Sequence, residues 1–266
     1  MTRIDSTFAQ LAKQGKKGFI AYITAGDPSL ADTVDIVLRL EEAGVDIVEL
    51  GIPFSDPLAD GRVNQESANR ALDAGTTPAG VLDTIAALRE RTQIPIMCYT
   101  YLNPYHAAGF ESMMRRSAKA GVDGLLFLDM PVEESDELVD LMRRYHLNNI
   151  SLVTPTTPPA RIKKIVQTAS GFIYCVSRIG VTGAQSELAA GAEALVRVTK
   201  KHSRLPVALG FGVSTPELAA QSAKAADAVV VGSAIVQRFH AAGTSAAGRR
   251  RAAAWVGSMV NAVKEL

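Results

Sequence analysis

The sequence contains 266 residues, of which 47% are hydrophobic and 21% charged, and its 28 Lys plus Arg against 27 Asp plus Glu give a formal net charge of +1. This balance is typical of an ordinary soluble globular protein, and it offers no electrostatic attraction to nucleic acid or to a membrane surface. The chain is also long enough to bury a substantial hydrophobic core.

The expected strands are short runs of nearly continuous apolar residues. Residues 3–14 are predicted to form a helix ahead of the first run. The runs themselves are typical of parallel strands that are buried on both faces. The eight runs cover residues 19–25, 46–51, 94–100, 124–129, 150–155, 172–177, 206–212 and 228–233.

Segments with helical spacing separate these runs. They lie at 29–43, 77–91, 111–120, 133–146, 160–169, 186–200, 216–224 and 247–264. Helix-start signals are found at Ser29, at Thr77 with Pro78, at Ser135 and at Thr215 with Pro216. The basic run 249–251 falls in the last segment, and we interpret it as a solvated helix face because adjacent helical residues point in different directions.

Eight alternations of strand and helix predict βαβ units in one parallel sheet. In a chain of this length they close naturally into a (β/α)8 TIM barrel, here with an extra N-terminal helix and a single domain over residues 1–266. A doubly wound open sheet is the structural alternative. In such a barrel the active site lies on the loops at the carboxyl ends of the strands, so these positions come first.

The cysteines and the N-terminus indicate a cytoplasmic protein. Cys98 and Cys175 each lie inside an apolar run, which suits free buried thiols in a reducing compartment. The N-terminal residues are interrupted by charges, and no apolar run approaches the roughly 20 residues that span a bilayer.

One charged residue, Glu49, stands inside the second apolar run. A buried carboxylate costs several kcal/mol unless it is paired or protonated. Glu49 is therefore either part of a structural ion pair inside the barrel or a carboxyl group with a raised pKa that can transfer protons near neutral pH. Asp56 and Asp60 follow on the loop, where an aspartate is commonly a turn or capping residue.

Small residues follow three neighbouring strands near the C-terminus. They occur at 178–184, 211–214 and 232–234. Backbone N–H groups at such positions can approach an anion closely, and a helix N-terminus adds a favourable dipole. Three such loops at this end of a barrel predict a phosphate site that needs no lysine or arginine.

The string VELGIPFSDPLADG at 48–61 resembles the signature of the tryptophan synthase alpha subunit family. Further segments resemble the same family in the same order, so that the resemblance spans nearly the whole chain. They are GFIAYITAGDPS at 18–29, FLDMPVEES at 127–135, TPTTP at 154–158, SRIGVTGA at 177–184, LGFGVS at 209–214 and VGSAIV at 231–236.

The resemblance implies a lyase that cleaves indole-3-glycerol phosphate to indole and glyceraldehyde 3-phosphate in tryptophan biosynthesis. It assigns Glu49 as the catalytic acid/base and Asp60 as the second catalytic residue, which accepts the indole N–H and stabilises the positive charge that develops there. Protonation of indole C3 and removal of the glycerol hydroxyl proton then drive the retro-aldol cleavage. The apolar runs contain no lysine for a Schiff base, and the four histidines are too dispersed for a metal site.

The same resemblance names the residues that bind substrate. Gly183, Gly212, Gly232 and Ser233 would hold the phosphate, with Phe211 nearby. Tyr22, Tyr99, Leu126, Tyr174 and Thr182 would line the rest of the pocket, with Thr182 on a loop that closes toward Asp60. From the residues alone, barrel core is the favoured interpretation of Tyr99, Leu126 and Tyr174.

One departure from the family pattern follows Asp60. Arg62, Val63 and Asn64 stand where the family usually has proline and then an apolar residue near the indole. A polar Asn64 puts the apolarity of that pocket wall in doubt, unless Val63 turns inward in its place.

The resemblance also implies a partner. A beta subunit that contains pyridoxal phosphate would form an α2β2 complex with this chain and receive indole through a channel, while the chain itself binds no cofactor. Asp56 and the segment 101–105 match positions expected at that interface, although exposed turns would explain Asn103 and Pro104 as well. The alternatives are a stand-alone lyase that releases free indole, an inactive allosteric partner and, more weakly, a phosphoribosyl isomerase barrel.

Overall fold

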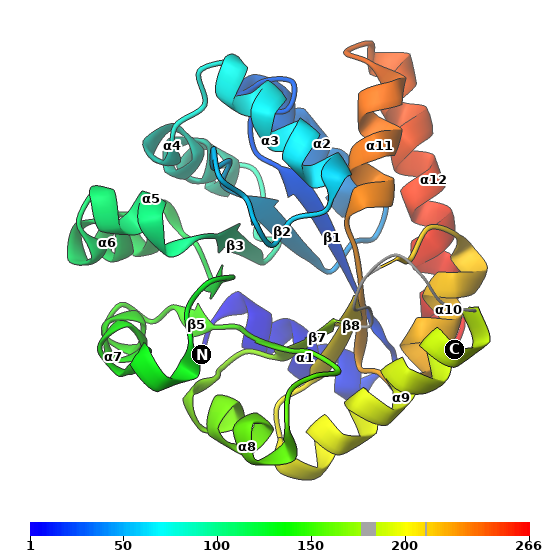
Figure 1. The fold of residues 1–266 in the computed structure, drawn as a ribbon. Helices are drawn as coiled ribbons and strands as arrows, with labels where there is room; N and C mark the ends of the chain where they lie inside the picture. The colour runs from blue at the N-terminus through cyan, green and yellow to red at the C-terminus, as the bar shows by residue number, and fades with distance from the viewer. Residues whose placement is uncertain (177–184, 211) are drawn as a thin grey trace.

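A computed structural model describes residues 1–176, 185–210 and 212–266, and in it a ring of parallel strands is surrounded by helices (Figure 1). The strands coincide closely with the apolar runs of the sequence, and most of their residues are buried. They are β1 (Gly18–Thr24), β2 (Ile47–Gly51), β3 (Ile96–Thr100), β4 (Gly124–Phe127), β5 (Asn148–Asn149), β6 (Ser151–Val153), β7 (Ile173–Val176), β8 (Val207–Gly210) and β9 (Ala228–Val231).

The sheet closes into a barrel, which confirms the expected fold and removes the open-sheet alternative. All of the strand pairs are parallel, in the order β5-β4-β3-β2-β1-β9-β8-β7-β6. The two end strands, β5 and β6, are consecutive in the chain and separated only by Ile150. The single strand expected at 150–155 was wrong in its bounds: the segment begins at Asn148, and its first half pairs with β4 while its second half pairs with β7.

The helices outside the barrel include all of those expected from the sequence. They are α1 (Arg3–Lys13), α2 (Leu30–Glu42), α4 (Pro78–Arg89), α6 (Phe110–Ala120), α7 (Asp136–Arg144), α8 (Pro159–Thr168), α9 (Gln185–His202), α10 (Pro216–Ala225) and α12 (Ala246–Lys264), with a 3-10 turn at Val132–Glu134. The structure adds α3 (Arg62–Asp73), α5 (Leu102–Ala107) and α11 (Ser233–Ala242), which were not predicted.

The local signals at the helix ends were mostly correct. The side chains of Ser29, Thr77 and Thr215 each accept a hydrogen bond from a backbone N–H of the first helical turn. Ser135 precedes α7 but makes no such bond, because its hydroxyl donates to the Val132 carbonyl instead. The solvated face expected at 249–251 was wrong for Arg249, which is buried and forms ion pairs with two aspartates of α2.

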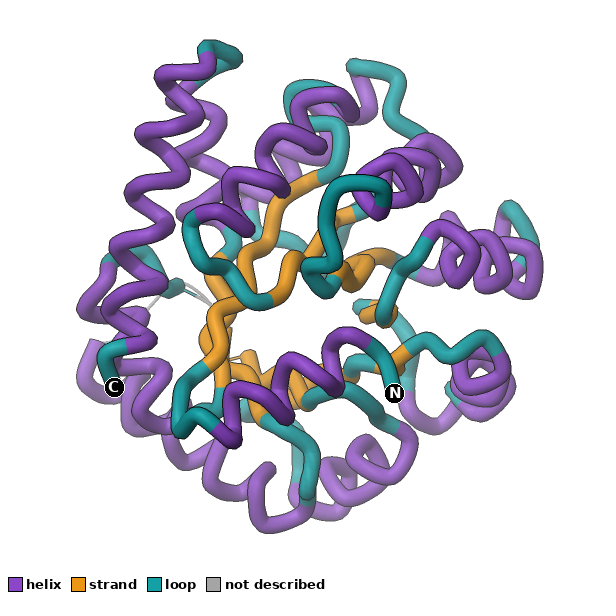
Figure 2. Tube along the Cα trace, turned by 180° about the vertical axis from the view of Figure 1, so that it is seen from behind, coloured by secondary structure: helices purple, strands orange, loops and turns teal. Residues whose placement is uncertain are grey.

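The extra N-terminal helix α1 crosses the end of the barrel at which the strands begin (Figure 2). Ile4 and Phe8 on this helix join the interior side chains of the strands in one hydrophobic cluster. The ring of Phe8 lies 5.5 Å from that of Phe172, just before β7. Because α1 fills this end, the opposite end is left for a site.

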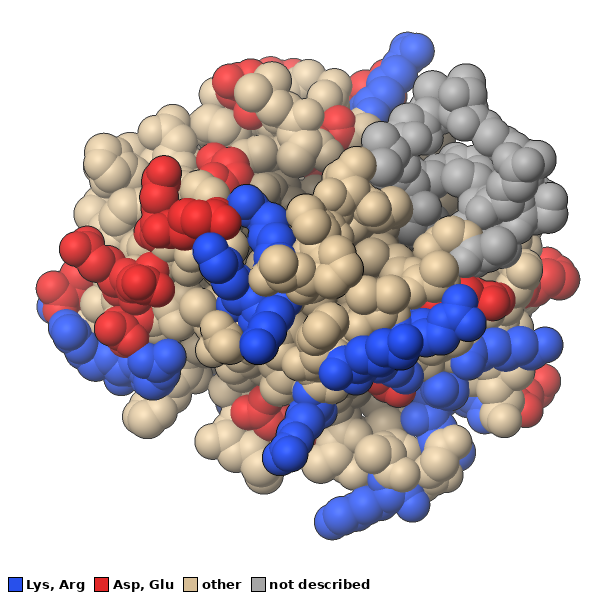
Figure 3. Space-filling model, turned by 60° about the horizontal axis from the view of Figure 1, so that its bottom comes forward, with Lys and Arg blue, Asp and Glu red and all other residues tan. Residues whose placement is uncertain are grey.

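The surface carries charges of both signs, and Figure 3 shows lysines and arginines on the same face as aspartates and glutamates. Within the described residues, no helix is long and apolar enough to cross a membrane. The same residues contain no group of three or more His, Cys, Asp or Glu side chains that could hold a metal ion.

Candidate active site

The alternation of side chains along each strand places a group of polar residues inside the barrel, near the carboxyl ends of the strands. Strand pairing sets Tyr22 of β1 beside Glu49 of β2, and Gly51 beside Tyr99 of β3. Residues two apart on a strand share a face, so Glu49 and Gly51 both point to the interior. The site therefore begins on β1, β2 and β3.

Glu49 lies in this interior with only 1% of its surface exposed. Its Oε1 has no hydrogen-bond partner among the described residues, and none of their ion pairs includes it. Burial, followed by the nearby charge of Asp60, raises the pKa of Glu49 to about 8 from an ordinary value of 4.5. The described surroundings thus favour a protonated acid at neutral pH over a structural ion pair.

Tyr22 packs beside this acid through contacts that depend on a glycine. Its hydroxyl lies 3.3 Å from the Thr24 hydroxyl, and its ring meets that of Tyr99 edge-on at a centroid distance of 5.0 Å. A Cβ at Gly51 would lie 2.5 Å from the Tyr22 hydroxyl oxygen. Gly51 therefore leaves the space that the tyrosine occupies, a role that the sequence did not reveal.

Asp60 is held by hydroxyl groups that reach it from β3 and the residue after it. Tyr99 donates to Oδ1 and Tyr101 donates to Oδ2, both over 2.8 Å, while the Ala59 N–H donates to the Tyr101 hydroxyl over 3.0 Å. Burial raises the pKa of Asp60, and the bonds from Tyr101 and Tyr99 act against this shift by favouring the carboxylate.

Tyr101 is a site residue that was not expected from the sequence. The signal was present, because the inward positions 97 and 99 continue by the same alternation to 101. Its ring packs against Phe54 at a centroid distance of 5.3 Å, so that Tyr101 also holds the loop between β2 and α3.

Asn64 lies beside the same acid. A side-chain hydrogen bond with Asn64 further lowers the pKa of Asp60, while Asn64 Oδ1 is buried and has no partner among the described residues. The departure from the family pattern therefore places a polar amide next to Asp60, and the neighbouring Val63 is half-buried.

Leu126 and Tyr174 belong to the interior cluster of the barrel. Leu126 is fully buried on β4, next to Tyr99 in the register. Tyr174 packs against the same cluster from β7, and a Cβ at Gly210 would lie 2.7 Å from its hydroxyl. Both residues thus occupy core positions inside the barrel, which agrees with the core interpretation.

Three of the expected phosphate residues, Gly212, Gly232 and Ser233, follow the ends of β8 and β9. Gly232 precedes α11 directly and forms its N-cap, with Ser233 as the first helical residue. Gly212 has a φ of 77°, a backbone conformation that favours glycine. The other expected residues at this end, Thr182, Gly183 and Phe211, lie outside the described residues.

The family model described as tryptophan synthase alpha chain matches residues 8–264. A tryptophan synthase alpha chain from Caldanaerobacter subterraneus subsp. tengcongensis is 47% identical and covers 90% of this chain and 91% of its own length. One from Geobacter sulfurreducens is 45% identical over 100% of this chain and 98% of its own.

Solved structures agree with these sequence relatives. The tryptophan synthase alpha subunit of Legionella pneumophila superposes with a TM-score of 0.91 at 36% identity, covering 100% of both chains. A chain of tryptophan synthase from M. tuberculosis gives a TM-score of 0.89 at 29% identity and covers 99% of each chain. The chain therefore belongs to the tryptophan synthase alpha chain family and is a carbon–carbon lyase that cleaves indole-3-glycerol phosphate in tryptophan biosynthesis.

Proposed function

We propose that Glu49 transfers both protons of the cleavage reaction and that Asp60 binds the indole N–H as a carboxylate. The observation that supports this division of roles is the contrast in hydrogen bonding. Glu49 Oε1 has no partner among the described residues, whereas both oxygens of Asp60 accept a bond from a tyrosine. Burial favours the protonated form of the first acid, and the hydroxyl donors favour the ionised form of the second.

In the proposed reaction, protonated Glu49 first gives its proton to C3 of the indole ring. The ring nitrogen becomes positively charged, and the Asp60 carboxylate stabilises this charge through the N–H group. Ionised Glu49 then removes the proton of the hydroxyl on the carbon attached to C3. The electrons of that O–H bond form the aldehyde, the C–C bond breaks, and its electron pair restores the indole. Glu49 ends as it began, protonated.

We propose that the phosphate is bound by backbone N–H groups at the ends of β8 and β9. The N-terminus of α11, with Gly232 and Ser233, offers amide donors and a favourable helix dipole. Gly212 would contribute from the loop after β8, and Thr182, Gly183 and Phe211 are proposed on the family resemblance alone. With the phosphate at these strand ends, the indole would extend across the barrel toward Glu49 and Asp60.

The test of Glu49 is a Glu49→Gln variant of the full chain, assayed for indole release from indole-3-glycerol phosphate. Because glutamine has nearly the same shape but cannot transfer the proton, we expect kcat to fall roughly 10²- to 10⁴-fold. Glu137→Gln, an exposed glutamate on α7, is the matched control and should leave kcat unchanged. A Glu49→Gln variant as fast as the wild type would overturn the proposal and would leave the chain as a binding partner.

The pH dependence gives a second test of the same residue. The reaction begins with protonated Glu49, whose pKa is about 8, so the protonated fraction decreases as the pH rises through this value. We expect kcat/KM to fall about tenfold for each pH unit above the pKa. A rate that stays constant well above pH 8 would contradict a protonated starting state.

We also propose that the chain works with a beta subunit in an α2β2 complex, and that the pyridoxal phosphate belongs to that subunit. In support, Leu58 is 83% exposed on the loop that carries Asp60, next to an exposed Asp56. Adding a beta subunit should stimulate indole turnover, and a Leu58→Asp variant should weaken this stimulation. An absence of stimulation would favour the stand-alone lyase.

We further propose one domain over residues 1–266 and a cytoplasmic location, the latter supported by two free, buried cysteines.

A further inference from the structure

An ion pair connects the end of β1 to α3, outside the group of residues assigned to the reaction. Asp27 accepts hydrogen bonds from the Ser67 hydroxyl at 2.5 Å and from Arg70 Nε and Nη2 at 3.0 and 2.6 Å. The Asp27 side chain is 9% exposed and Ser67 is fully buried. A two-nitrogen contact of this kind fixes both distance and orientation.

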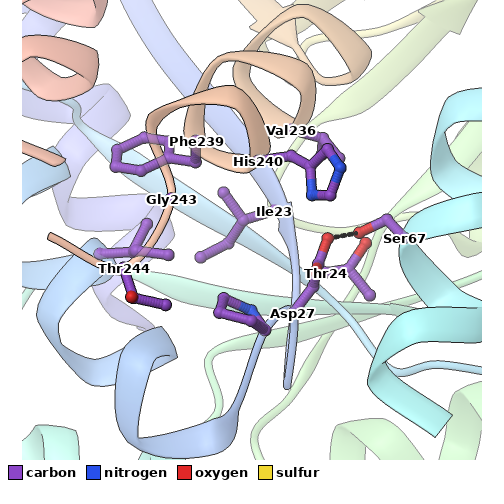
Figure 4. Close-up of a pocket in the computed structure, with 11 residues that line it drawn as sticks. Ile23, Thr24, Asp27, Ser67, Val236, Phe239, His240, Gly243 and Thr244 are labelled. Atoms are coloured by element: carbon purple, nitrogen blue, oxygen red, sulfur yellow. Dashed lines mark hydrogen bonds between the residues drawn. The ribbon is translucent and has the colours of Figure 1, made fainter. Parts of the chain in front are cut away.

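Helix α3 packs against α11 and β1 with few large apolar side chains. Its buried residues are Ser67, Ala68 and Ala71, so its buried apolar side chains are two alanines. A cavity of about 230 Å³ is lined by residues of β1, α2 and α11 and by Ser67 of α3, and Figure 4 shows Asp27 and Ser67 hydrogen-bonded on its wall. Because two alanine side chains bury little apolar area, the polar contacts with Asp27 contribute to holding this helix in place.

The first turn of α3 holds Asp60. The Gln65 side chain donates to the Asp60 carbonyl at 2.9 Å, and the Asn64 side chain bonds to the Asp60 carboxylate. Gly61 is the N-cap and makes no side-chain cap bond of its own. Ser67 lies roughly 7.5 Å along the helix axis from its first residue. Asp60 is therefore bonded to the same helix that Asp27 contacts at Ser67.

The Asp27 end of this connection is also fixed. Gly26 has a φ of +87° and lies so close to Thr76, just beyond α3, that a Cβ would be 1.9 Å from the threonine hydroxyl. Its N–H donates to the Thr33 hydroxyl at 2.9 Å. The segment after β1 is thus held between α2 and the residues that follow α3.

We propose that Asp27, Ser67 and Arg70 position Asp60 for the reaction through α3. We call them the α3 tether. They are positioning residues, since they act on the substrate only through Asp60. This inference rests on the proposed role of Asp60 and adds a set of residues that determines where its carboxylate lies.

The experiment uses Ser67→Ala and Arg70→Met in the full chain, each with Asp60 intact and with Asp60→Asn. With Asp60 intact we expect kcat to fall roughly tenfold, because a small misplacement of a catalytic group costs this much or more. KM should change little, since the proposed phosphate contacts lie at other strand ends. In the Asp60→Asn background the same changes should have no further effect on kcat. Arg70→Lys should restore part of the rate, because lysine keeps the charge but not the two-nitrogen contact.

Lys264→Met provides the matched control. It removes the ion pair between Lys264 and Asp46, whose side chains are 20% and 16% exposed, an exposure similar to that of the Arg70–Asp27 pair. Asp46 directly precedes β2, at the other end of the barrel. This variant should lower the melting temperature without changing kcat. If the tether variants lower kcat equally in both Asp60 backgrounds, or not at all, the tether proposal fails while the role of Asp60 stands. If Asp60→Asn alone leaves kcat unchanged, the role of Asp60 fails and the tether proposal fails with it.

Discussion

Strand β2 supplies the buried Glu49 and the loop after it supplies the half-buried Asp60, and the protein holds the two acids in different ways. Glu49 is positioned by backbone pairing to β1 and β3, and the described side chains leave its Oε1 without a hydrogen bond. Asp60 is on a loop and is positioned by Tyr99 and Tyr101. A strand can therefore present an acid without stabilising its charge. A loop needs side-chain bonds to fix its acid, and those bonds also favour the ionised form.

The largest effect expected at the loop acid comes from removing its charge alone. Asp60→Asn keeps the shape of the side chain but removes the carboxylate that faces the indole N–H, so kcat should fall roughly 10²- to 10³-fold. Indole release by the full chain is the measurement. Asp56→Asn, an exposed aspartate on the same loop, is the control and should keep the wild-type rate without a beta subunit. Equal rates for wild type and Asp60→Asn would mean that the loop acid is structural.

A second expected effect concerns stability. The carboxyl of Glu49 titrates near pH 8 in the folded protein against an ordinary value of 4.5. Below pH 4.5 both states are protonated. Between these values the unfolded state loses its proton first, so wild-type stability falls with rising pH, by at most about 1.4 kcal/mol per unit. Glu49→Gln has no carboxyl group at this position, so its stability should not fall in this way as the pH rises.

Urea unfolding of Glu49→Gln and wild type at pH 5 and pH 8 measures this difference. The variant should gain stability over the wild type at pH 8, and much less at pH 5. Asp60→Asn should gain less at pH 8, because tyrosine donors already stabilise the Asp60 carboxylate. If the difference in free energy of unfolding between Glu49→Gln and the wild type is the same at pH 5 and pH 8, folding does not raise the pKa of Glu49.

The smallest expected effect concerns the tyrosines. Tyr101→Phe removes a donor to Asp60 and the acceptor of the Ala59 N–H, so kcat should fall roughly tenfold. Tyr99→Phe removes only the donor and should cost less. Both changes raise the pKa of Asp60, which should move the acidic limb of the pH–rate profile to higher pH. Tyr145→Phe, on the outer surface, serves as the control, and an unmoved limb would contradict the assignment.

The barrel was predictable because buried parallel strands leave a clear signal of short apolar runs. Glu49 was noticeable for the same reason, as a charge inside one of these runs. Helix α3 was missed because its buried residues are alanines and a serine, so that it has no apolar stripe to detect. Its position depends on Asp27, about 40 residues earlier in the chain, and local patterns contain no information on such distant hydrogen bonds.

Asp60 could be chosen over Asp56 only through the family resemblance. In the structure Asp60 is distinguished by hydrogen bonds from Tyr99 of β3 and from Tyr101 just after it, residues about 40 positions later in the chain. The interruption at Ile150 was also missed, since it results from the change of partner from β4 to β7 rather than from a break in apolar character.

The pairing of β1 with β9 brings together Gly18 and Ala228, residues 210 positions apart. Most other neighbouring strands are successive units along the chain, so this seam forms only after nearly the whole protein has been synthesised. Until then β1 exposes the edge of a mostly apolar strand, which is a ready template for association with another chain. The pairing of β9 with β1 thus covers this edge and opposes aggregation. Chains that end before β9 should therefore be far less soluble than the intact protein.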